Sequence, residues 1–319
     1  MEDSVKQTPA LAERLLAGQP AALARAISLI EAEAPAAPAL LKAIRSHLGR
    51  AAVVGFTGPP GAGKSTLVNA FVGEMRRRGR TVGVAAVDPS SPVTGGAVLG
   101  DRIRMAEHTL DTGVFIRSLA SRGHLGGLSV SAARVTDLMD AAGFDVVILE
   151  TVGAGQSEVE MAELADVCIV VSAPGLGDDV QAIKAGILEI SHVLVVNKCD
   201  LPLARRTQLQ LESMLGLRAR SDWKIPVLAT NALDGTGLPE LADAVERCMS
   251  ERPPKTGREA QSGRSRRLLA QSTARLVENL ILADSSDEIT EIINATQSAE
   301  LSLKEAAETI LQLMAERTR

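Results

Sequence analysis

The chain has 319 residues and a formal net charge of −5, so it lacks the basic surface field that general nucleic-acid binding requires. Aromatic residues make up only 2% of it and Tyr is absent, which argues against stacking platforms for single-stranded nucleic acid. Its apolar runs are too short to span a membrane and its first residues do not resemble a signal peptide, so we expect a cytoplasmic protein without membrane association. The three cysteines stand far apart, which favours thiols in a reducing compartment over disulfides or a metal site.

Residues 1–49 are predicted to form helices that pack on the rest of the chain. Apolar residues recur there at helical spacing, as in Leu23, Ala26, Ile27 and Ile30. Gly and Pro residues interrupt the pattern and divide it into short helices. We therefore expect a helical segment, residues 1–49, ahead of the main domain.

A glycine-rich stretch, Gly58-Pro-Pro-Gly-Ala-Gly-Lys-Ser-Thr66, follows the apolar run Ala51–Phe56 and precedes a helical pattern. It has the G-x-x-x-x-G-K-[ST] spacing in the strand, loop and helix context that makes this motif credible as a nucleoside triphosphate site. Glycines let backbone N–H groups surround a phosphate, Lys64 can reach the β- and γ-phosphates as a catalytic residue, and Ser65 can bind Mg²⁺. The predicted contacts to the nucleotide are Gly58, Pro60, Gly61, Ala62, Gly63, Lys64, Ser65 and Thr66. The basic cluster Arg76-Arg-Arg-Gly-Arg80 is expected to be a solvated helix end.

From residue 50 to residue 250, apolar strand-like runs alternate with longer helical patterns. Runs so continuously apolar are typical of strands buried on both faces, as in a parallel sheet covered by helices. The sequence therefore predicts an α/β fold, with a P-loop domain over residues 50–250 built on a mainly parallel β-sheet. The predicted strands are Ala51–Phe56, Val82–Val87, Phe115–Arg117 (a weak pattern), Val146–Leu149, Val167–Val171, Val193–Val196 and Val227–Ala229.

The stretch Asn197-Lys-Cys-Asp200, after one of these strands, matches the N-K-x-D pattern of GTPases. The Asp200 carboxylate can accept hydrogen bonds from guanine N1–H and from the exocyclic amine, a donor pair that adenine lacks. Asn197 is expected to hold neighbouring loops and to meet the purine, and the aliphatic stem of Lys198 to stack on the base. Asn231 and Ala232 fall where GTPases contact guanine O6 through the backbone. The predicted ligand is therefore GTP or GDP rather than ATP.

Two acids at strand ends, Asp88 and Glu150, are the candidates to surround Mg²⁺. Ser65 and Asp88 are the expected direct ligands, and Glu150 is expected to act through water. Glu150 begins a segment in which the N–H of Gly153 can meet the γ-phosphate. The alternative is that either acid simply caps a helix.

A third acid, Asp101, ends a Gly-rich stretch that is expected to close over the nucleotide. It is a candidate to orient the catalytic water or to bind the metal, and equally a candidate N-cap of the next helix. Further along, Asp178, Asp179, Gln181 and Lys184 span little more than one helical turn. The spacing alone favours a solvated helix start for these four residues.

The composition changes near residue 251 to Pro, Gly, Lys, Arg and Ser, which predicts a linker before a helical tail over residues 251–319. Ser285 with Glu288, and Ser302 with Glu305, have the spacing of capping boxes. Such a tail cannot bury its apolar face alone. It packs on the main domain or, the alternative we favour, pairs with a second subunit.

Taken together, these motifs resemble those of the MeaB/ArgK group, the P-loop GTPases that act as chaperones of adenosylcobalamin-dependent acyl-CoA mutases. The resemblance rests on the phosphate loop, Val87-Asp-Pro-Ser-Ser-Pro92, Gly95-Gly-Ala-Val-Leu-Gly-Asp-Arg102, Glu150-Thr-Val-Gly-Ala-Gly-Gln-Ser-Glu158 and Asn197-Lys-Cys-Asp200. It implies a homodimer that hydrolyses GTP to gate loading, protection and repair of the mutase cofactor.

The resemblance also implies roles for residues that spacing alone does not assign. Gln181 and Lys184 match a third switch that approaches the nucleotide when the mutase docks, and Asp101 gains weight as a catalytic or metal-linked residue alongside Glu150. Asn231 departs from the family, whose usual residue there is Ser. Two alternatives stay open: a small-molecule kinase of the arginine/ornithine type, and a nickel-delivery GTPase, although the latter usually carries a Cys/His cluster.

Overall fold

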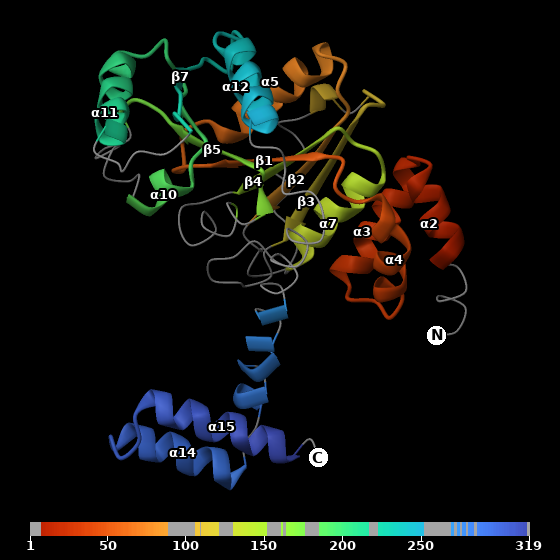
Figure 1. Ribbon diagram of the computed structural model, residues 1–319, viewed down its shortest axis with the longest axis vertical. Coiled ribbons are helices and arrows are strands. Elements are labelled where there is room, and N and C mark those ends of the chain that lie inside the picture. The colour runs from red at the N-terminus through yellow and green to blue at the C-terminus, as the bar shows by residue number, and fades with distance from the viewer. Residues whose placement is uncertain are drawn as a thin grey trace. The chain divides into compact units, whose positions relative to one another are not determined.

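The computed structural model describes residues 8–88, 106–108, 110–120, 130–151, 161, 164–175, 185–216, 223–251, 269–270, 273–274, 276–278, 280–283 and 286–317. The chain divides into two compact units, Met1–Gln261 and Ser262–Arg319. Figure 1 shows both units, and each is considered by itself below.

The described part of the first unit contains a seven-stranded sheet in which every neighbouring pair is parallel. The strand order is β3-β2-β4-β1-β5-β6-β7. The strands are β1 (Ala52–Thr57), β2 (Val82–Asp88), β3 (Val114–Ala120), β4 (Val146–Thr151), β5 (Val167–Ser172), β6 (Val193–Val196) and β7 (Val227–Ala229). All seven predicted strands are confirmed, and so is the α/β fold class.

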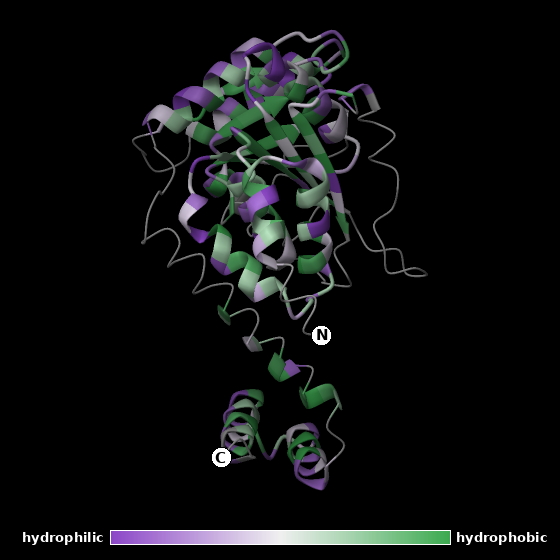
Figure 2. Ribbon diagram, turned by 90° about the vertical axis from the view of Figure 1, so that its right-hand side faces the viewer, coloured by the Kyte–Doolittle hydropathy of each residue, from purple (hydrophilic) through white to green (hydrophobic). Residues whose placement is uncertain are grey.

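Helices cover both faces of this sheet, which explains why its strands are apolar throughout (Figure 2). On one face, α5 (Lys64–Arg77) and α12 (Leu238–Glu251) share a core with the strands, in which Phe56 and Phe71 meet edge to face at 5.4 Å between ring centroids. On the other face lie α7 (Val130–Ala141), α10 (Ala185–Ile190) and α11 (Ala204–Gly216). The carboxyl ends of the parallel strands therefore share one edge, the usual location of ligands in such folds.

The predicted N-terminal helices are present and pack on α7. They are α2 (Thr8–Leu16), α3 (Pro20–Glu31) and α4 (Ala37–Ile44), followed by the short helix η1 (Arg45–His47). The Asp140 carboxylate on α7 accepts hydrogen bonds from the backbone N–H groups of Gly49, Arg50 and Ala51, the last at 2.8 Å. It thereby fixes the connection from the helical segment into β1.

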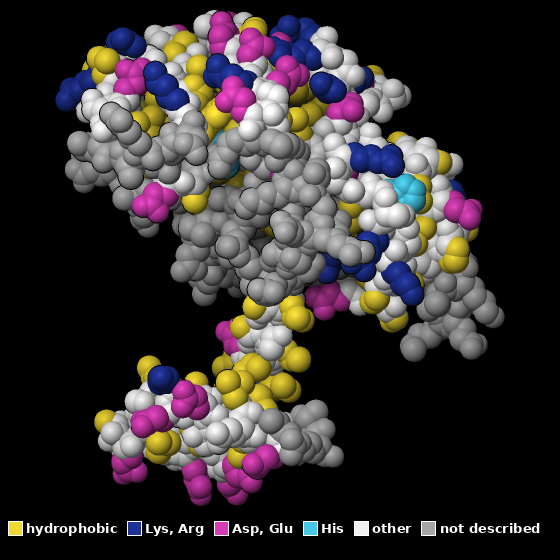
Figure 3. All heavy atoms as spheres, viewed as in Figure 1, with side chains coloured by type: hydrophobic (Ala, Val, Ile, Leu, Met, Phe, Trp, Pro, Cys, Tyr) yellow, Lys and Arg dark blue, Asp and Glu magenta, His cyan; other side chains and the backbone are white. Residues whose placement is uncertain are grey.

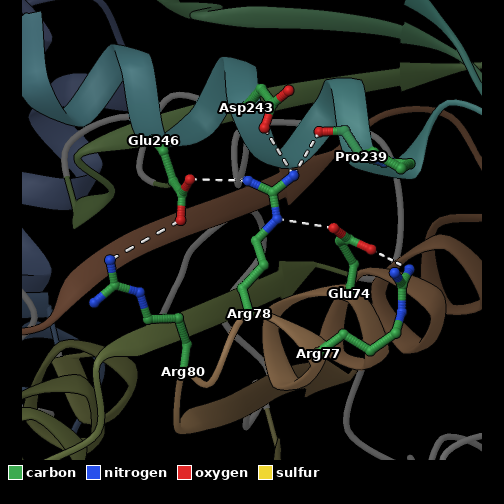
Figure 4. A network of polar contacts seen from close by, with 7 residues as sticks. All are labelled: Glu74, Arg77, Arg78, Arg80, Pro239, Asp243 and Glu246. Atoms are coloured by element: carbon green, nitrogen blue, oxygen red, sulfur yellow. Dashed lines mark hydrogen bonds and ion pairs between the residues drawn. The ribbon is translucent and has the colours of Figure 1, made fainter.

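The basic cluster at the end of α5 is not simply solvated, so that expectation was wrong (Figure 4). Arg78 donates to Glu74 of α5 at 2.8 Å. It also donates to three groups of α12: the Glu246 carboxylate at 2.9 Å, the Asp243 carboxylate at 2.8 Å and the Pro239 carbonyl at 2.9 Å. Its side chain is 21% exposed, whereas that of Arg77 is 66% exposed. Arg78 thus joins α5 to α12, whereas Arg77 and Arg80, whose side chains are more than half exposed, are closer to the expected surface cations.

The second unit is helical in its described parts. The described residues between 269 and 283 are helical, and α14 (Asp287–Gln297) and α15 (Leu303–Arg317) follow. The predicted capping box before α15 is confirmed, since Ser302 and Glu305 exchange side chain to backbone bonds at 2.9 and 3.3 Å. The other predicted box, Ser285 with Glu288, is wrong, because α14 begins at Asp287 with Ser286 as its N-cap, and the residue three positions after Ser286 is Ile289.

An apolar groove of about 670 Å³ lies within this second unit, between the described helical residues from 269 to 281 and α15. Its lining includes Leu269, Val277, Ile281, Ile310 and Leu311. Hydrophobic side chains cover much of the described part of this segment in Figure 3. Over the described residues of the whole chain, no helix has the length and apolar character needed to cross a membrane.

Candidate functional site

The phosphate loop joins the end of β1 to the start of α5 and requires glycine at three positions. Gly58, Gly61 and Gly63 have φ values of 140°, 81° and 85°, which L side chains rarely adopt. A Cβ on Gly58 would collide with the Val171 carbonyl oxygen of β5, and one on Gly63 would lie 2.6 Å from Asn197 Nδ2. The loop is therefore a cradle of bare backbone at the N-terminus of α5, which fits an anionic phosphate.

Lys64 is folded back along this cradle. Its Nζ donates to the carbonyl oxygens of Gly58 at 2.8 Å and Pro59 at 3.0 Å, and the residue is buried. Of the other predicted contacts, Ala62 is buried, whereas Pro60, Gly61 and Thr66 are exposed on the loop and the first helical turn. The ammonium thus lies within the phosphate loop, bonded to two of its carbonyl oxygens.

Ser65 and Glu150 meet across the sheet edge. The Ser65 hydroxyl donates to Glu150 Oε1 at 2.5 Å, and Glu150 is fully buried. Strand register explains the contact, since Glu150 of β4 lies level with Phe56 of β1 on the face that α5 covers. Asp88 ends the neighbouring strand β2 at the same edge, one residue beyond the pair formed by Val87 and Thr151.

This hydroxyl and this carboxylate are oxygen ligands of the kind that Mg²⁺ prefers. No group of three or more His, Cys, Asp or Glu side chains suited to a metal ion occurs among the described residues. A metal ion here would therefore depend on phosphate oxygens and water for the rest of its ligands, as is usual for Mg²⁺ with nucleotides.

Asn197, at the end of β6, holds three loops together. Its Nδ2 donates to the phosphate-loop carbonyls of Ala62 at 3.0 Å and Gly63 at 3.4 Å. Its Oδ1 accepts from the Thr230 hydroxyl at 3.2 Å and the Ala232 N–H at 3.3 Å. With 2% of its surface exposed, Asn197 makes the predicted base and phosphate segments one connected site.

The remaining predicted base-reading residues lie beside this connection. Lys198 has a φ of 56°, and its Nζ donates to the Gly61 carbonyl at 2.8 Å, so that its aliphatic stem extends toward the phosphate loop. Asp200 is exposed. An exposed carboxylate next to an apolar stem can bind the edge of a purine while the stem covers its face.

Asn231 and Ala232 lie in the loop after β7. Asn231 is 7% exposed, and its amide donates to Asp234 at 2.8 Å and accepts from the Leu233 N–H at 3.1 Å. Bonds from Thr236 and Asn231 lower the pKa of the Asp234 carboxyl. Burial, with nearby Asp234 and Asp200, raises the pKa of the Cys199 thiol, which argues against a reactive thiolate there.

The structure therefore brings together the phosphate-loop residues, Glu150 and the predicted base-reading residues. Asp101, Gly153, Gln181 and Lys184 lie outside the described residues, as does the side chain of Asp88. Sequence reasoning missed the Thr230 hydroxyl and Asp234. The available signal for Asp234 was its position before Gly235 and Thr236, typical of a turn in which a carboxylate binds a backbone N–H two residues on.

Comparison with known families matches residues 23–290 to a family described as methylmalonyl Co-A mutase-associated GTPase MeaB. A Pyrococcus horikoshii protein, provisionally named a GTPase, is 48% identical over 240 residues, which are 74% of this chain and 76% of that protein. The Escherichia coli GTPase ArgK is 43% identical over 73% of each chain.

Two further similarities extend these matches. The mouse protein named methylmalonic aciduria type A homolog, mitochondrial, is 37% identical over 72% of this chain and 60% of its own length. The crystal structure of a protein named LAO/AO transport system kinase covers 97% of this chain and 98% of its own, with a TM-score of 0.73 and 29% identity.

Proposed function

Because this chain belongs to the MeaB family of methylmalonyl Co-A mutase-associated GTPases, we propose that its GTP hydrolysis serves an adenosylcobalamin-dependent acyl-CoA mutase. The GTPase would gate loading of the mutase cofactor, and its protection and repair. Support comes from the family description and from the relative named for methylmalonic aciduria. The carrying observation in the structure is the connection that Asn197 makes between the phosphate loop and the base-reading loops.

In this proposal the described residues divide the work of holding GTP. Backbone N–H groups of the Gly58–Gly63 loop bind the phosphates, and Lys64 leaves its two carbonyl partners to neutralise the β- and γ-phosphates. Asp200 accepts from guanine N1–H and the exocyclic amine, while the stem of Lys198 covers one face of the base.

Ser65, Asp88 and Glu150 would hold Mg²⁺, with Glu150 also orienting Ser65 through their 2.5 Å hydrogen bond. The ion, when bound, would neutralise charge on the phosphates. Asp101, Gly153, Gln181 and Lys184 receive their roles from the family resemblance alone. Asp101 would orient water or assist the metal, Gly153 would bind the γ-phosphate, and Gln181 with Lys184 would respond to the mutase.

We also propose that the second unit pairs two copies of this chain. Leu269, Leu276, Leu280 and Leu311 are between 48% and 68% exposed in that unit, and two of them line the apolar groove. An exposed apolar surface of this kind is typical of an interaction site. A second copy would supply the apolar face needed to bury it.

The decisive measurement is release of inorganic phosphate from GTP, with and without each purified adenosylcobalamin mutase of the same organism. A marked acceleration by one mutase is expected and would identify the partner. The matched control is Lys64→Ala, which should hydrolyse no GTP with or without the mutase. If no mutase accelerates phosphate release while the basal turnover of GTP is intact, the chaperone role is contradicted.

A small-molecule kinase is the second candidate, because the solved structure that covers 97% of this chain is named a transport system kinase. The same assay separates the two functions when arginine or ornithine is added. A kinase would transfer the γ-phosphate to the amino acid, whereas a GTPase releases all of it as inorganic phosphate. Equilibrium dialysis with Ni²⁺ would test the nickel-delivery alternative.

A further inference from the structure

We propose that Asn231 and Asp234 are positioning residues for guanine recognition, because their side-chain pair sets the Ala232 N–H that would select a 6-oxo purine. The inference rests on the base pocket of the proposed function and deepens it. We call the pair the Asn231–Asp234 bracket.

The bracket uses both ends of the Asn231 amide. Its Nδ2 donates to Asp234 Oδ2 at 2.8 Å, and its Oδ1 accepts from the Leu233 N–H at 3.1 Å. The other carboxylate oxygen, Asp234 Oδ1, accepts from the Thr236 N–H at 2.9 Å. The side chains thus hold the turn on either side of Ala232, and Asn231 does so while buried.

The backbone closes the same loop. Asn231 N–H donates to the Thr236 carbonyl at 2.9 Å, and Gly235 N–H donates to the Asn231 carbonyl at 3.0 Å. Gly237 then turns with a φ of 75°, where a Cβ would collide with the Ala229 carbonyl oxygen. All of these contacts are made within the loop and to the end of β7, so the chain itself defines the shape of the loop.

Ala232 N–H is the group that this loop presents. Its only described acceptor is Asn197 Oδ1 at 3.3 Å, a long bond compared with the usual distance of about 2.9 Å. If the Ala232 N–H binds a ligand instead, Asn197 Oδ1 still accepts from the Thr230 hydroxyl. A purine with a carbonyl at position 6 accepts from this N–H, whereas the 6-amino group of adenine does not.

Asn at position 231 suits this task because one side chain supplies a donor and an acceptor together. A Ser at position 231, the residue that its family resemblance leads one to expect, would carry donor and acceptor on one oxygen, whereas Asn carries them on two separate atoms that contact Asp234 and the Leu233 N–H. In this chain, therefore, the geometry of the loop depends on a pair of side chains rather than on one hydroxyl.

The test compares three nucleotides that differ at one position each, by displacement of a fluorescent GDP analogue from the full-length protein. Relative to GTP, 6-thio-GTP replaces the 6-oxygen by a weaker acceptor, and ITP lacks only the 2-amino group. We expect Asn231→Ala to reduce the preference for GTP over 6-thio-GTP by about threefold to tenfold, the value of one hydrogen bond. The preference for GTP over ITP, which reports Asp200, should not change.

A charge swap supplies the rescue. Asn231→Asp alone places two carboxylates together and should also reduce the preference for GTP over 6-thio-GTP. Adding Asp234→Asn restores one amide and one carboxylate, and the double variant should recover that preference. Recovery would separate a positioning role from general damage to the fold.

The results that overturn the proposal are equally specific. If Asn231→Ala folds and keeps the wild-type ratio of GTP to 6-thio-GTP, or loses affinity for both by the same factor, the bracket does not position the amide. Failure of the base pocket itself has another signature. In that case the wild-type protein would bind GTP and ITP with equal affinity, and Asp200→Asn would change neither affinity.

Discussion

Gly63, the N-cap residue of α5, lies in a space that leaves no room for a side chain. The φ of 85° excludes most L residues, and the Asn197 amide lies 2.6 Å from the place that a Cβ would take. Since Asn197 also binds Thr230 and Ala232, displacing it would disturb the phosphate cradle and the base loops together.

We therefore predict that Gly63→Ala lowers GTP affinity at least tenfold. Gly79→Ala is the matched control, because Gly79 has a similar φ of 78° but nothing lies within 4 Å of its Cβ position. Both variants should lose about 1 kcal/mol of stability from backbone strain. Titration with a fluorescent GDP analogue and thermal unfolding would measure the two effects, and equal affinity in both variants would contradict the role given to the Gly63 contact.

The residue scale is also where sequence reasoning worked best for the site. Lys64, Ser65, Asn197 and Asp200 could be predicted because their motifs specify a local backbone geometry over a few residues. The Thr230 hydroxyl could not, since its bond to Asn197 joins segments 33 residues apart across the ends of two strands.

Among the elements, the end of α5 is fixed to the segment before β3 by one ion pair. The Arg76 guanidinium binds Asp111 through two bonds of 2.8 Å, and the Gly113 N–H donates to the same carboxylate. The Arg76 hydrogen bonds, and then the Gly113 bond, lower the pKa of Asp111 to about 2. A depressed carboxyl pKa stabilises the fold above its unfolded value of about 3.9, and this stabilisation is lost as pH falls toward 2.

Asp111→Asn is accordingly predicted to lower the thermal midpoint at pH 7, with a gap to wild type that narrows as the pH is lowered from 4 toward 2. Glu107→Gln is the control, because the described partner of this nearby surface carboxylate is the Asn69 amide at 3.5 Å. It should follow the wild type at every pH. A gap for Asp111→Asn that stays constant across the range would show that the carboxylate does not contribute through its charge.

The elements themselves were predicted unevenly. Buried strands such as β5 can be predicted from an unbroken run of apolar residues. The edge strand β3 extends over Val114–Ala120, but only Phe115–Arg117 gave a weak pattern. The physical reason is Arg117, which points to α3 and pairs with Glu31, so that the strand carries a charge where a buried strand would be apolar.

At the scale of the whole molecule, the proposed dimer depends on the apolar groove of the second unit. Leu269→Glu combined with Leu311→Glu should convert the dimer to a monomer, because burying two carboxylates in that groove is unfavourable. Leu110→Glu, at a leucine of the first unit that is 94% exposed, should leave the dimer intact. Sedimentation velocity measures the outcome, with circular dichroism to verify that the helices persist; a dimer that survives the double substitution would contradict this assignment.

The sequence allows the class of architecture to be predicted, but not the order in which the strands lie in the sheet. Alternating strands and helices indicate a parallel sheet, but the order β3-β2-β4-β1-β5-β6-β7 depends on long-range packing that periodicity does not encode. The predicted boundaries at residues 49 and 250 likewise stay predictions. Composition changes mark linkers, whereas the contacts that define a unit form only in three dimensions.

The hydrogen bonds from the backbone of residues 49–51 to the Asp140 carboxylate have a consequence for synthesis on the ribosome. The bonded groups are about 90 residues apart in the chain, and α2, α3 and α4 pack on the helix that carries Asp140. At typical translation rates this separation corresponds to roughly 5 to 20 s. During that interval α2, α3 and α4 can pack on one another, but the helix that they cover in the finished fold has not yet been made, so the side chains that face α7 stay uncovered until it has emerged.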